Sequence, residues 1–217
     1  MNKALVIGAT GLVGSSLVQQ LLTDEHFDTV IVFTRRATGM QSTKLVEHIV
    51  DFDAPQSWKH LAKGDVLFSA MGTTIAKAGS KEAQYKIDFT YQYQTAKNAA
   101  ENSVPCYVLI SSAGASSRSR IFYSRMKGEL EEAVKKLPFK IIHIIQPGIL
   151  SGHRQEKRLG EQIGIKVLNV LHHLPGLGSY KPIDAGIVAR AMINAATKDG
   201  EGIYTTTLKE VFALGAQ

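Results

Sequence analysis

The chain has 217 residues, 44% of them hydrophobic and 20% charged, a composition that excludes wholesale disorder and suits a single globular domain. No run approaches the roughly 18 to 20 apolar residues of a membrane span, and the N-terminus carries no signal-peptide pattern. The one cysteine, Cys106, excludes an internal disulfide and fits a reducing compartment. We therefore predict a cytoplasmic protein without a membrane partner.

The net charge of +6 is placed unevenly along the chain. All of the excess lies in residues 111–217, where acids such as Glu129 and Glu156 are interleaved with the bases. Interleaved charge favours a solvated surface or an anion-binding mouth over a nucleic-acid interface. We do not expect nucleic acid as a partner.

Short β-branched runs alternate with longer segments of helical periodicity, the pattern of a parallel sheet covered by helices on both faces. We expect strands near residues 3–8, 29–34, 45–50, 65–70, 106–111, 140–146 and 202–206. We expect helices after the first strand and near residues 80–101, 121–137, 161–174 and 183–196. No repeat or linker interrupts this order, so the sequence predicts one α/β domain over residues 1–217, a doubly wound parallel sheet with a short C-terminal extension on the substrate side.

A glycine-rich turn joins the first strand to the first helix, with Gly8, Gly11 and Gly14 spaced G-x-x-G-x-x-G. In this context the first glycine permits a tight turn, the second lets backbone N–H groups approach a pyrophosphate, and the third lets the helix pack on the strand. The alternative is a glycine-rich turn without a ligand. We predict a dinucleotide site formed by Gly8, Thr10, Gly11, Leu12, Val13 and Gly14.

The end of the second strand indicates which nicotinamide cofactor is bound. It reads Phe33-Thr34-Arg35-Arg36 and contains no carboxylate. An acidic residue there would bind the ribose 2′-hydroxyl, whereas an arginine accommodates a 2′-phosphate. We predict that NADP(H) is favoured over NAD(H), with Arg35 as the first contact and Arg36 as the second, unless these arginines are solvated loop charges.

Two Tyr-x-x-x-Lys pairs occur, Tyr93 with Lys97 and Tyr123 with Lys127. Only the second pair comes after the strand at 106–111, which ends in two serines at the edge of the sheet where α/β folds bind ligands. Spacing of four places a tyrosine and a lysine on one helix face. We therefore select Tyr123 and Lys127 as the catalytic candidates.

This pair suggests acid–base chemistry. The Lys127 ammonium would stabilise the phenolate of Tyr123, which would give or take a proton while a serine hydroxyl holds the substrate oxygen. The alternative is structural, with Tyr123 capping the helix start and Lys127 pairing with Glu131.

Together with Pro147-Gly148-Ile149-Leu150 and Arg154-Gln155-Glu156, these motifs resemble those of atypical short-chain dehydrogenases/reductases, most closely the Tat-interacting-protein oxidoreductase branch, over nearly the whole chain. The resemblance implies an NAD(P)-binding Rossmann fold of the epimerase/dehydratase-like type and oxidoreductase activity. It implies that Lys127 also contacts the nicotinamide ribose and that Asp51 and Phe52 border the adenine. It extends the cofactor site to Ala70, Met71, Gly72, Thr73, Ser111, Tyr123, Pro147, Gly148 and Ile149.

The serine assignment is open between two neighbours. Ser112 matches the catalytic position of the family, but the interval from Ser112 to Tyr123 is shorter than is typical of the wider superfamily. Ser111 is therefore the alternative catalytic serine.

The sequence thus predicts an NADPH-dependent oxidoreductase that transfers a hydride to or from an unidentified small carbonyl or alcohol through Ser112, Tyr123 and Lys127. The alternative is a non-catalytic NADPH-binding regulatory protein that senses redox state and acts through a protein partner. The helices at 80–101 and 121–137 are candidates for pairing two copies in a homodimer. We expect no metal, a structural role for Cys106, and a segment 151–160 that is either a basic lid over an anion or a solvated loop.

Overall fold

The computed structural model describes residues 2–151 and 182–216. Its centre is a seven-stranded sheet in the order β3-β2-β1-β4-β5-β6-β9, in which every neighbouring pair is parallel. The strands are β1 (Asn2–Ile7), β2 (Phe27–Thr34), β3 (Leu45–Ile49), β4 (Val66–Ser69), β5 (Cys106–Ile110), β6 (Ile141–Gln146) and β9 (Gly202–Thr207). All seven strands expected from the sequence are present, and the doubly wound α/β fold is confirmed.

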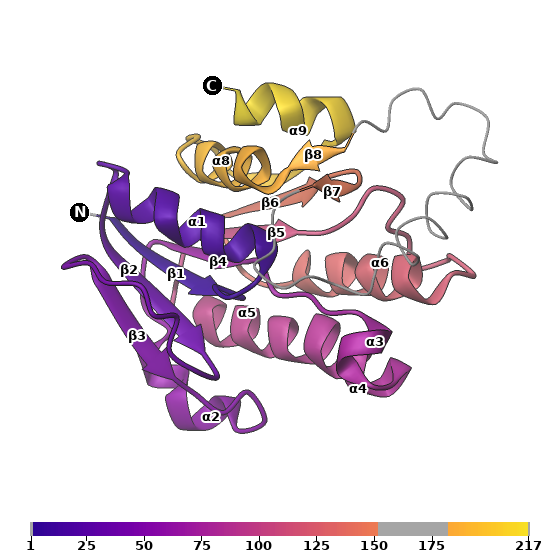
Figure 1. The fold of residues 1–217 in the computed structure, drawn as a ribbon, viewed down its shortest axis with the longest axis horizontal. Coiled ribbons are helices and arrows are strands. Elements are labelled where there is room, and N and C mark those ends of the chain that lie inside the picture. The colour runs from indigo at the N-terminus through magenta and orange to yellow at the C-terminus, as the bar shows by residue number, and fades with distance from the viewer. Residues whose placement is uncertain (1, 152–181, 217) are drawn as a thin grey trace.

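Helices cover both faces of this sheet (Figure 1). On one face α1 (Leu12–Thr23), α8 (Ala185–Ala196) and α9 (Leu208–Gly215) pack over buried residues such as Val6, Val108 and Ile145. On the other face α2 (Pro55–Trp58), α5 (Gln92–Glu101) and α6 (Phe122–Val134) pack over Leu5 and Leu109. Because the central strands are buried from both sides, β4 and β5 are apolar almost throughout instead of alternating.

The helix expected at residues 80–101 is divided into three parts. A short helix α4 (Lys81–Tyr85) is followed by a π-helical segment η2 (Lys86–Tyr91) and then by α5. Side chains bond to backbone carbonyls here: the Gln92 amide donates to the Asp88 carbonyl at 2.6 Å, and the Thr95 hydroxyl donates to the Tyr91 carbonyl at 2.8 Å. A π-helical turn shifts the register of the helix by one residue. The hydrophobic periodicity of the sequence does not show this shift, so it predicts one continuous helix.

The C-terminal elements also correct the prediction. The helix expected at 183–196 begins only at Ala185, because the Asp184 carboxylate caps it by accepting from the Gly186 N–H at 2.7 Å. Ile183–Asp184 forms β8, which pairs with β7 (Leu150–Ser151). Helix α9 was not expected; it starts with a capping box between Thr207 and Glu210. The helix expected at 161–174 lies outside the described residues.

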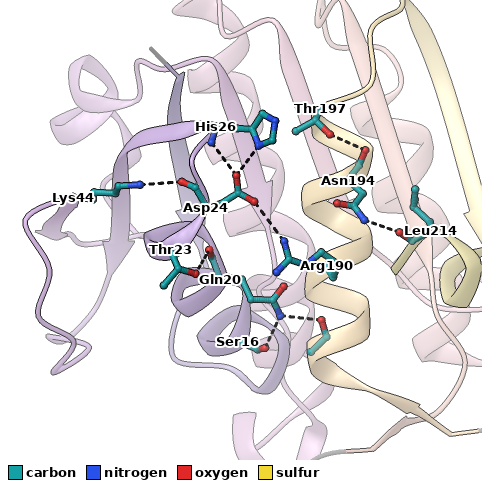
Figure 2. Close-up of polar contacts among 11 residues, drawn as sticks. Ser16, Gln20, Thr23, Asp24, His26, Lys44, Arg190, Asn194, Thr197 and Leu214 are labelled. Carbon is teal, nitrogen blue, oxygen red and sulfur yellow. Dashed lines mark hydrogen bonds and ion pairs between the residues drawn. The ribbon is translucent and has the colours of Figure 1, made fainter. Parts of the chain in front are cut away.

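Polar contacts fix helix α1 against α8, as Figure 2 shows. Arg190 of α8 reaches the carboxylate of Asp24, just after α1, with 3.5 Å between Nη1 and Oδ2. The Gln20 amide of α1 donates to the Gly186 carbonyl at 2.9 Å. These contacts help to hold helix α1 in place, and the N-terminus of this helix follows the glycine turn. None of the helices in the described ranges is long and apolar enough to cross a membrane.

Candidate active site

Two glycines of the first turn are required by packing alone. Gly8 has φ +83°, and a Cβ there would lie 2.4 Å from the Ala70 carbonyl carbon. A Cβ at Gly14 would lie 2.0 Å from the Gly8 carbonyl oxygen. Both positions therefore exclude a side chain whether or not a ligand binds.

Gly11 differs from them. Its φ is −78°, and a Cβ there would lie 3.2 Å from the Gly8 oxygen, so the fold demands glycine less strictly. Gly11 is the N-cap of α1, and no side chain of the described residues caps this helix. The amides of the first turn are therefore available to an anion at the positive end of the helix dipole.

A cleft of about 200 Å³ opens beside this turn, and its floor is the carboxyl edge of β1, β2 and β4. Three cations line it, namely Arg35 and Arg36 after β2 and Lys77 of α3 (Ile75–Ala78). Within the described part of the chain, no Asp or Glu belongs to the lining. The cleft is therefore suited to an anionic ligand.

The cleft brings together ten of the residues predicted to bind the cofactor: Gly8, Thr10, Gly11, Arg35, Arg36, Phe52, Ala70, Met71, Gly72 and Thr73. Six lining residues were not predicted, namely Ala9, Phe33, Thr34, Lys77, Ile87 and Tyr91. Phe33 and Thr34 could have been found, because they end the strand that carries the arginines. Lys77, Ile87 and Tyr91 carry no sequence signal, since they reach the cleft only through the positions of α3 and η2.

The loop after β3 is tied to η2 at one end of the cleft. The Tyr91 hydroxyl donates to Asp53 Oδ1 at 2.9 Å, and Lys86 Nζ lies 2.7 Å from the same oxygen. These hydrogen bonds hold the pKa of Asp53 below its ordinary value. The Phe52 and Tyr91 rings lie 5.5 Å apart and form an aromatic wall. The predicted contact Asp51 precedes this wall but does not line the cleft.

Two buried side chains, Asp88 and Gln84, hold the loop after β4 in place. The Thr73 N–H donates to Asp88 Oδ1 at 2.7 Å, and the Gln84 amide donates to the Thr73 carbonyl at 3.1 Å. Asp88 and Gln84 are both buried. The backbone from Met71 to Thr73 is thereby fixed along the floor of the cleft.

The two candidate serines have different surroundings. Ser111 is buried, and its hydroxyl donates a short hydrogen bond to Glu131 Oε1. The Gln146 amide donates to the same carboxylate oxygen at 2.8 Å. The Ser112 hydroxyl is half-buried, and its bond to the Ala113 carbonyl is long, at 3.4 Å. The arrangement leaves Ser112 better able to bind a substrate oxygen.

The tyrosine and the lysine of the second pair also differ in exposure. Tyr123 is 40% exposed, whereas Lys127, one turn later on α6, is 3% exposed. Glu131, the structural partner considered for Lys127, is instead bonded to Ser111 and Gln146. Tyr123 does not cap α6, whose N-cap is Ile121.

The loop between Ser112 and Tyr123 lies against α6. A Cβ on Gly128 would be 2.2 Å from the Ser117 backbone nitrogen, so only glycine lets this loop pass. The Ser116 N–H donates to the Ser124 carbonyl at 3.0 Å. By contrast, Lys97 of the first Tyr-x-x-x-Lys pair is exposed and lies 3.9 Å from Glu101, as in an ordinary surface ion pair.

Several predicted residues lie outside the cleft lining. They are the catalytic candidates Ser112, Tyr123 and Lys127 and the cofactor candidates Leu12, Val13, Gly14, Asp51, Ser111, Pro147, Gly148 and Ile149. Of these, Gly14 packs on Gly8, and the Pro147 carbonyl accepts from the Ala113 N–H at 3.0 Å, next to the serines. The basic segment expected at 151–160 lies outside the described residues from position 152 onward.

Two further sequence expectations concern reactive groups. Cys106 is buried in β5, and burial raises the pKa of its thiol to about 12, which leaves it unreactive as a nucleophile. Across residues 2–151 and 182–216, no three His, Cys, Asp or Glu side chains gather as metal ligands.

Comparisons with known proteins bear on the family and the fold of the chain. A family model described as the semialdehyde dehydrogenase NAD-binding domain matches residues 3–99. The protein named "Protein fmp52, mitochondrial" from Aspergillus fumigatus is 35% identical, and the match covers 99% of this chain and 95% of that protein. The predicted cytoplasmic location is wrong, because this relative and others of the same name are designated mitochondrial.

Two solved structures show the same fold. MoeE5 in complex with UDP-glucose and NAD has a TM-score of 0.70 at 15% identity, with 99% of this chain and 81% of that chain covered. The oxidoreductase ylbE from Lactococcus lactis has a TM-score of 0.68 at 18% identity, with 97% and 95% covered. The resemblance to NAD-binding dehydrogenase and epimerase folds is confirmed.

Proposed function

The chain belongs to the Fmp52 protein family and has the fold of NAD-binding short-chain dehydrogenases/reductases, and from this premise we propose that it is an NADPH-dependent oxidoreductase acting on a small carbonyl or alcohol. The observation that carries the proposal is the cleft beside the glycine turn, which has three cations and, within the described residues, no carboxylate in its lining.

The charge of this cleft favours NADPH over NADH. NAD sites of this fold use an Asp or Glu after the second strand to bind the ribose 2′-hydroxyl, and that carboxylate would repel a 2′-phosphate. Here Arg35 and Arg36 stand after β2 instead. The Thr34 hydroxyl donates to the Arg36 carbonyl at 2.8 Å and thereby fixes the turn that presents the two guanidinium groups.

The residues present fit a dinucleotide. The uncapped first turn of α1 would hold the pyrophosphate, Phe52 and Tyr91 would flank the adenine, and the loop from Ala70 to Thr73 would run along the cofactor. NADPH, when bound, supplies a hydride. In this proposal the cleft binds and orients the cofactor.

The chain's own acid–base chemistry follows from three side chains. Ser112 would donate a hydrogen bond to the substrate oxygen and so polarise the carbonyl. Tyr123, at 40% exposure, is open to a substrate and would transfer the proton at its hydroxyl. Lys127, one helical turn away, would stabilise the phenolate left behind.

Replacing the tyrosine tests this function. NADPH oxidation is followed with a panel of small aldehydes and quinones, and Tyr123→Phe is expected to lose at least about 100-fold in kcat, the scale of a lost general acid. Its NADPH Kd should stay within a few fold of wild type. Tyr93→Phe is the matched control, because it removes the same hydroxyl from the other Tyr-x-x-x-Lys pair and should keep the wild-type rate.

Two outcomes would contradict the proposal. A Tyr123→Phe protein with wild-type kcat would remove the tyrosine from the chemistry. A wild-type protein that binds NADPH tightly but oxidises it with none of the panel would instead favour a non-catalytic regulatory role.

A further inference from the structure

The loops at the carboxyl ends of β4, β5 and β6 carry positive charge and no acid. Residues 111–128, after β5, include three arginines and a lysine but no Asp or Glu. Residues 70–80, after β4, contain one lysine and no acid, and residues 146–151, at the end of β6, are uncharged. These three strands are neighbours and parallel, so their loops meet at one edge of the sheet. This edge, which carries the candidate catalytic residues, is therefore suited to an anion.

The loop between Ser112 and Tyr123 is held in a defined shape. The Arg125 guanidinium donates from Nη1 to the Ser119 carbonyl at 3.1 Å and to the Arg120 carbonyl at 3.4 Å. The Ser119 N–H closes a turn by donating to a backbone carbonyl three residues earlier, at 2.9 Å. Arg125 is therefore used within the protein, where it braces the turn that carries the other two arginines.

Arg118 and Arg120 differ from Arg125. Both are exposed, and in the ranges that the structure describes neither forms an ion pair with an acid. The nearest acids of α6 have other partners: Glu129 lies 3.9 Å from Arg125, and Glu132 accepts from a serine hydroxyl of the same loop at 2.5 Å. Two guanidinium groups on a braced loop are thus available to a carboxylate or phosphate from solution.

Exposed apolar side chains gather at the same edge. Ile121, between Arg120 and Tyr123, is 62% exposed, and Ile75 after β4 and Leu150 after β6 are also exposed. The remaining large apolar side chains that are exposed in the described ranges lie on β3 and β9, the outer strands of the sheet. Apolar surface around a tyrosine suits the apolar body of a small substrate.

The spacing along the chain allows one molecule to meet both kinds of group. Arg120 precedes Tyr123 by three residues, so their Cα atoms lie within about 11 Å of each other. The arginines are also distinct from those of the cofactor cleft. Strands β2 and β5 are separated by β1 and β4, which places their ends roughly 14 Å apart.

We propose that the substrate is an anionic carbonyl compound with an apolar body, and that Arg118 and Arg120 bind its carboxylate or phosphate group. This inference names the substrate class of the proposed function and rests on that function. The two arginines determine specificity by holding the acidic group, while the carbonyl meets Ser112 and Tyr123.

Matched aldehydes test the substrate class. NADPH oxidation is measured with 4-carboxybenzaldehyde, with 4-formylphenyl phosphate and with the uncharged methyl 4-formylbenzoate. The wild-type protein should favour one of the charged aldehydes in kcat/KM by at least about tenfold. The favoured aldehyde identifies the acidic group as a carboxylate or a phosphate. No preference over the ester would overturn the proposal.

Removing the arginines tests their role. The double variant Arg118→Ser/Arg120→Ser should lose the preference, while the rate with the ester and the NADPH Kd stay within threefold of wild type. Intrinsic differences in reactivity between the aldehydes cancel when the variant is compared with wild type. Lys135→Ser/Lys136→Ser is the matched control, because it removes two exposed charges just after α6 and should keep the preference. An equal loss in the control would assign the preference to net charge and overturn the proposal.

A binding measurement separates this inference from the proposed function. Calorimetry compares 4-methylbenzoate, which carries no aldehyde to reduce, with the neutral 4-methylbenzamide on the NADPH-loaded protein. The benzoate should bind at least about tenfold more tightly than the amide, and the arginine double variant should lose this difference. Arginine-dependent binding in a protein that reduces none of the aldehydes would contradict the proposed function and support the anion site. Reduction of the ester without arginine-dependent binding would support the proposed function and overturn the anion site.

Discussion

The hydroxyl of Ser111 donates to the buried carboxylate of Glu131. This contact distinguishes Ser111 from its sequence neighbour Ser112. Gln146 donates to the same carboxylate at 2.8 Å and links β6 to α6. Ser111 therefore joins the end of β5 to α6, while Ser112 is only half-buried, as the substrate-binding role proposed for its hydroxyl requires.

Exchanging each serine for alanine should separate stability from catalysis. Ser111→Ala leaves the Glu131 carboxylate with one donor fewer and should lower the free energy of unfolding by about 1–3 kcal/mol. Ser112→Ala should unfold like wild type but lose about 100-fold in kcat. Denaturant unfolding and steady-state kinetics check the pair, and the reverse assignment of losses would identify Ser111 as the catalytic serine.

The glycine turn allows a similar separation. Gly14→Ala forces a Cβ to 2.0 Å from the Gly8 oxygen and should destabilise the fold by about 3 kcal/mol or more. Gly11→Ala meets backbone only at 3.2 Å and should cost about 1 kcal/mol of stability, while NADPH affinity falls at least tenfold. Thermal unfolding and cofactor titration give the two values. A Gly11→Ala protein with wild-type affinity would show that the turn does not approach a pyrophosphate.

Arg35 should determine the preference for the phosphorylated cofactor. Arg35→Ser removes a cation from the cleft and should weaken NADPH binding about tenfold, or about 1.4 kcal/mol, with no change for NADH. Arg36→Ser is the matched control and should have the smaller effect. Equal loss of both cofactors in Arg35→Ser would mean that this residue does not contact the 2′-phosphate.

A buried histidine should make the stability of the protein sensitive to acid. His143 of β6 stacks on Tyr204, and burial, aided by the Lys198 charge, lowers the pKa of His143 to about 4. The unfolded chain, with a histidine pKa near 6.5, binds more protons below that pH, so stability is full above about pH 6.5 and falls as the pH drops toward 4.

The loss across this window should be about 3 kcal/mol. Urea unfolding between pH 4 and 7 measures it, with His143→Phe expected to flatten the dependence. An unchanged slope in His143→Phe would assign the acid sensitivity to other groups.

The sheet could be predicted from the sequence because its strands are apolar on both faces. Runs such as Cys106–Ile110 are buried throughout and cannot be read as amphipathic surface segments. The positions of the glycine turn and of the arginines after β2 could likewise be predicted, because they depend on residues that are close together in the sequence. Helix α9 was missed, although its capping residues Thr207 and Glu210 carry the three-residue spacing of a capping box.

The rest depended on contacts between distant segments. Asp88 has the appearance of an ordinary polar residue in a helix until η2 turns it toward Thr73, fifteen residues earlier. Lys77 becomes a cation of the cleft only because α3 follows the loop after β4, whose residues Gly72 and Thr73 also line the cleft. Periodicity and spacing contain no information on either placement.

The most direct test of the account is a titration of the purified wild-type chain with NADPH and, separately, with NADH, followed by nicotinamide fluorescence at physiological salt. The account predicts micromolar binding of NADPH and at least tenfold weaker binding of NADH, a difference of about 1.4 kcal/mol. Equal affinity for the two cofactors would contradict the role given to the arginines after β2, and binding of neither would contradict the proposed function as a whole.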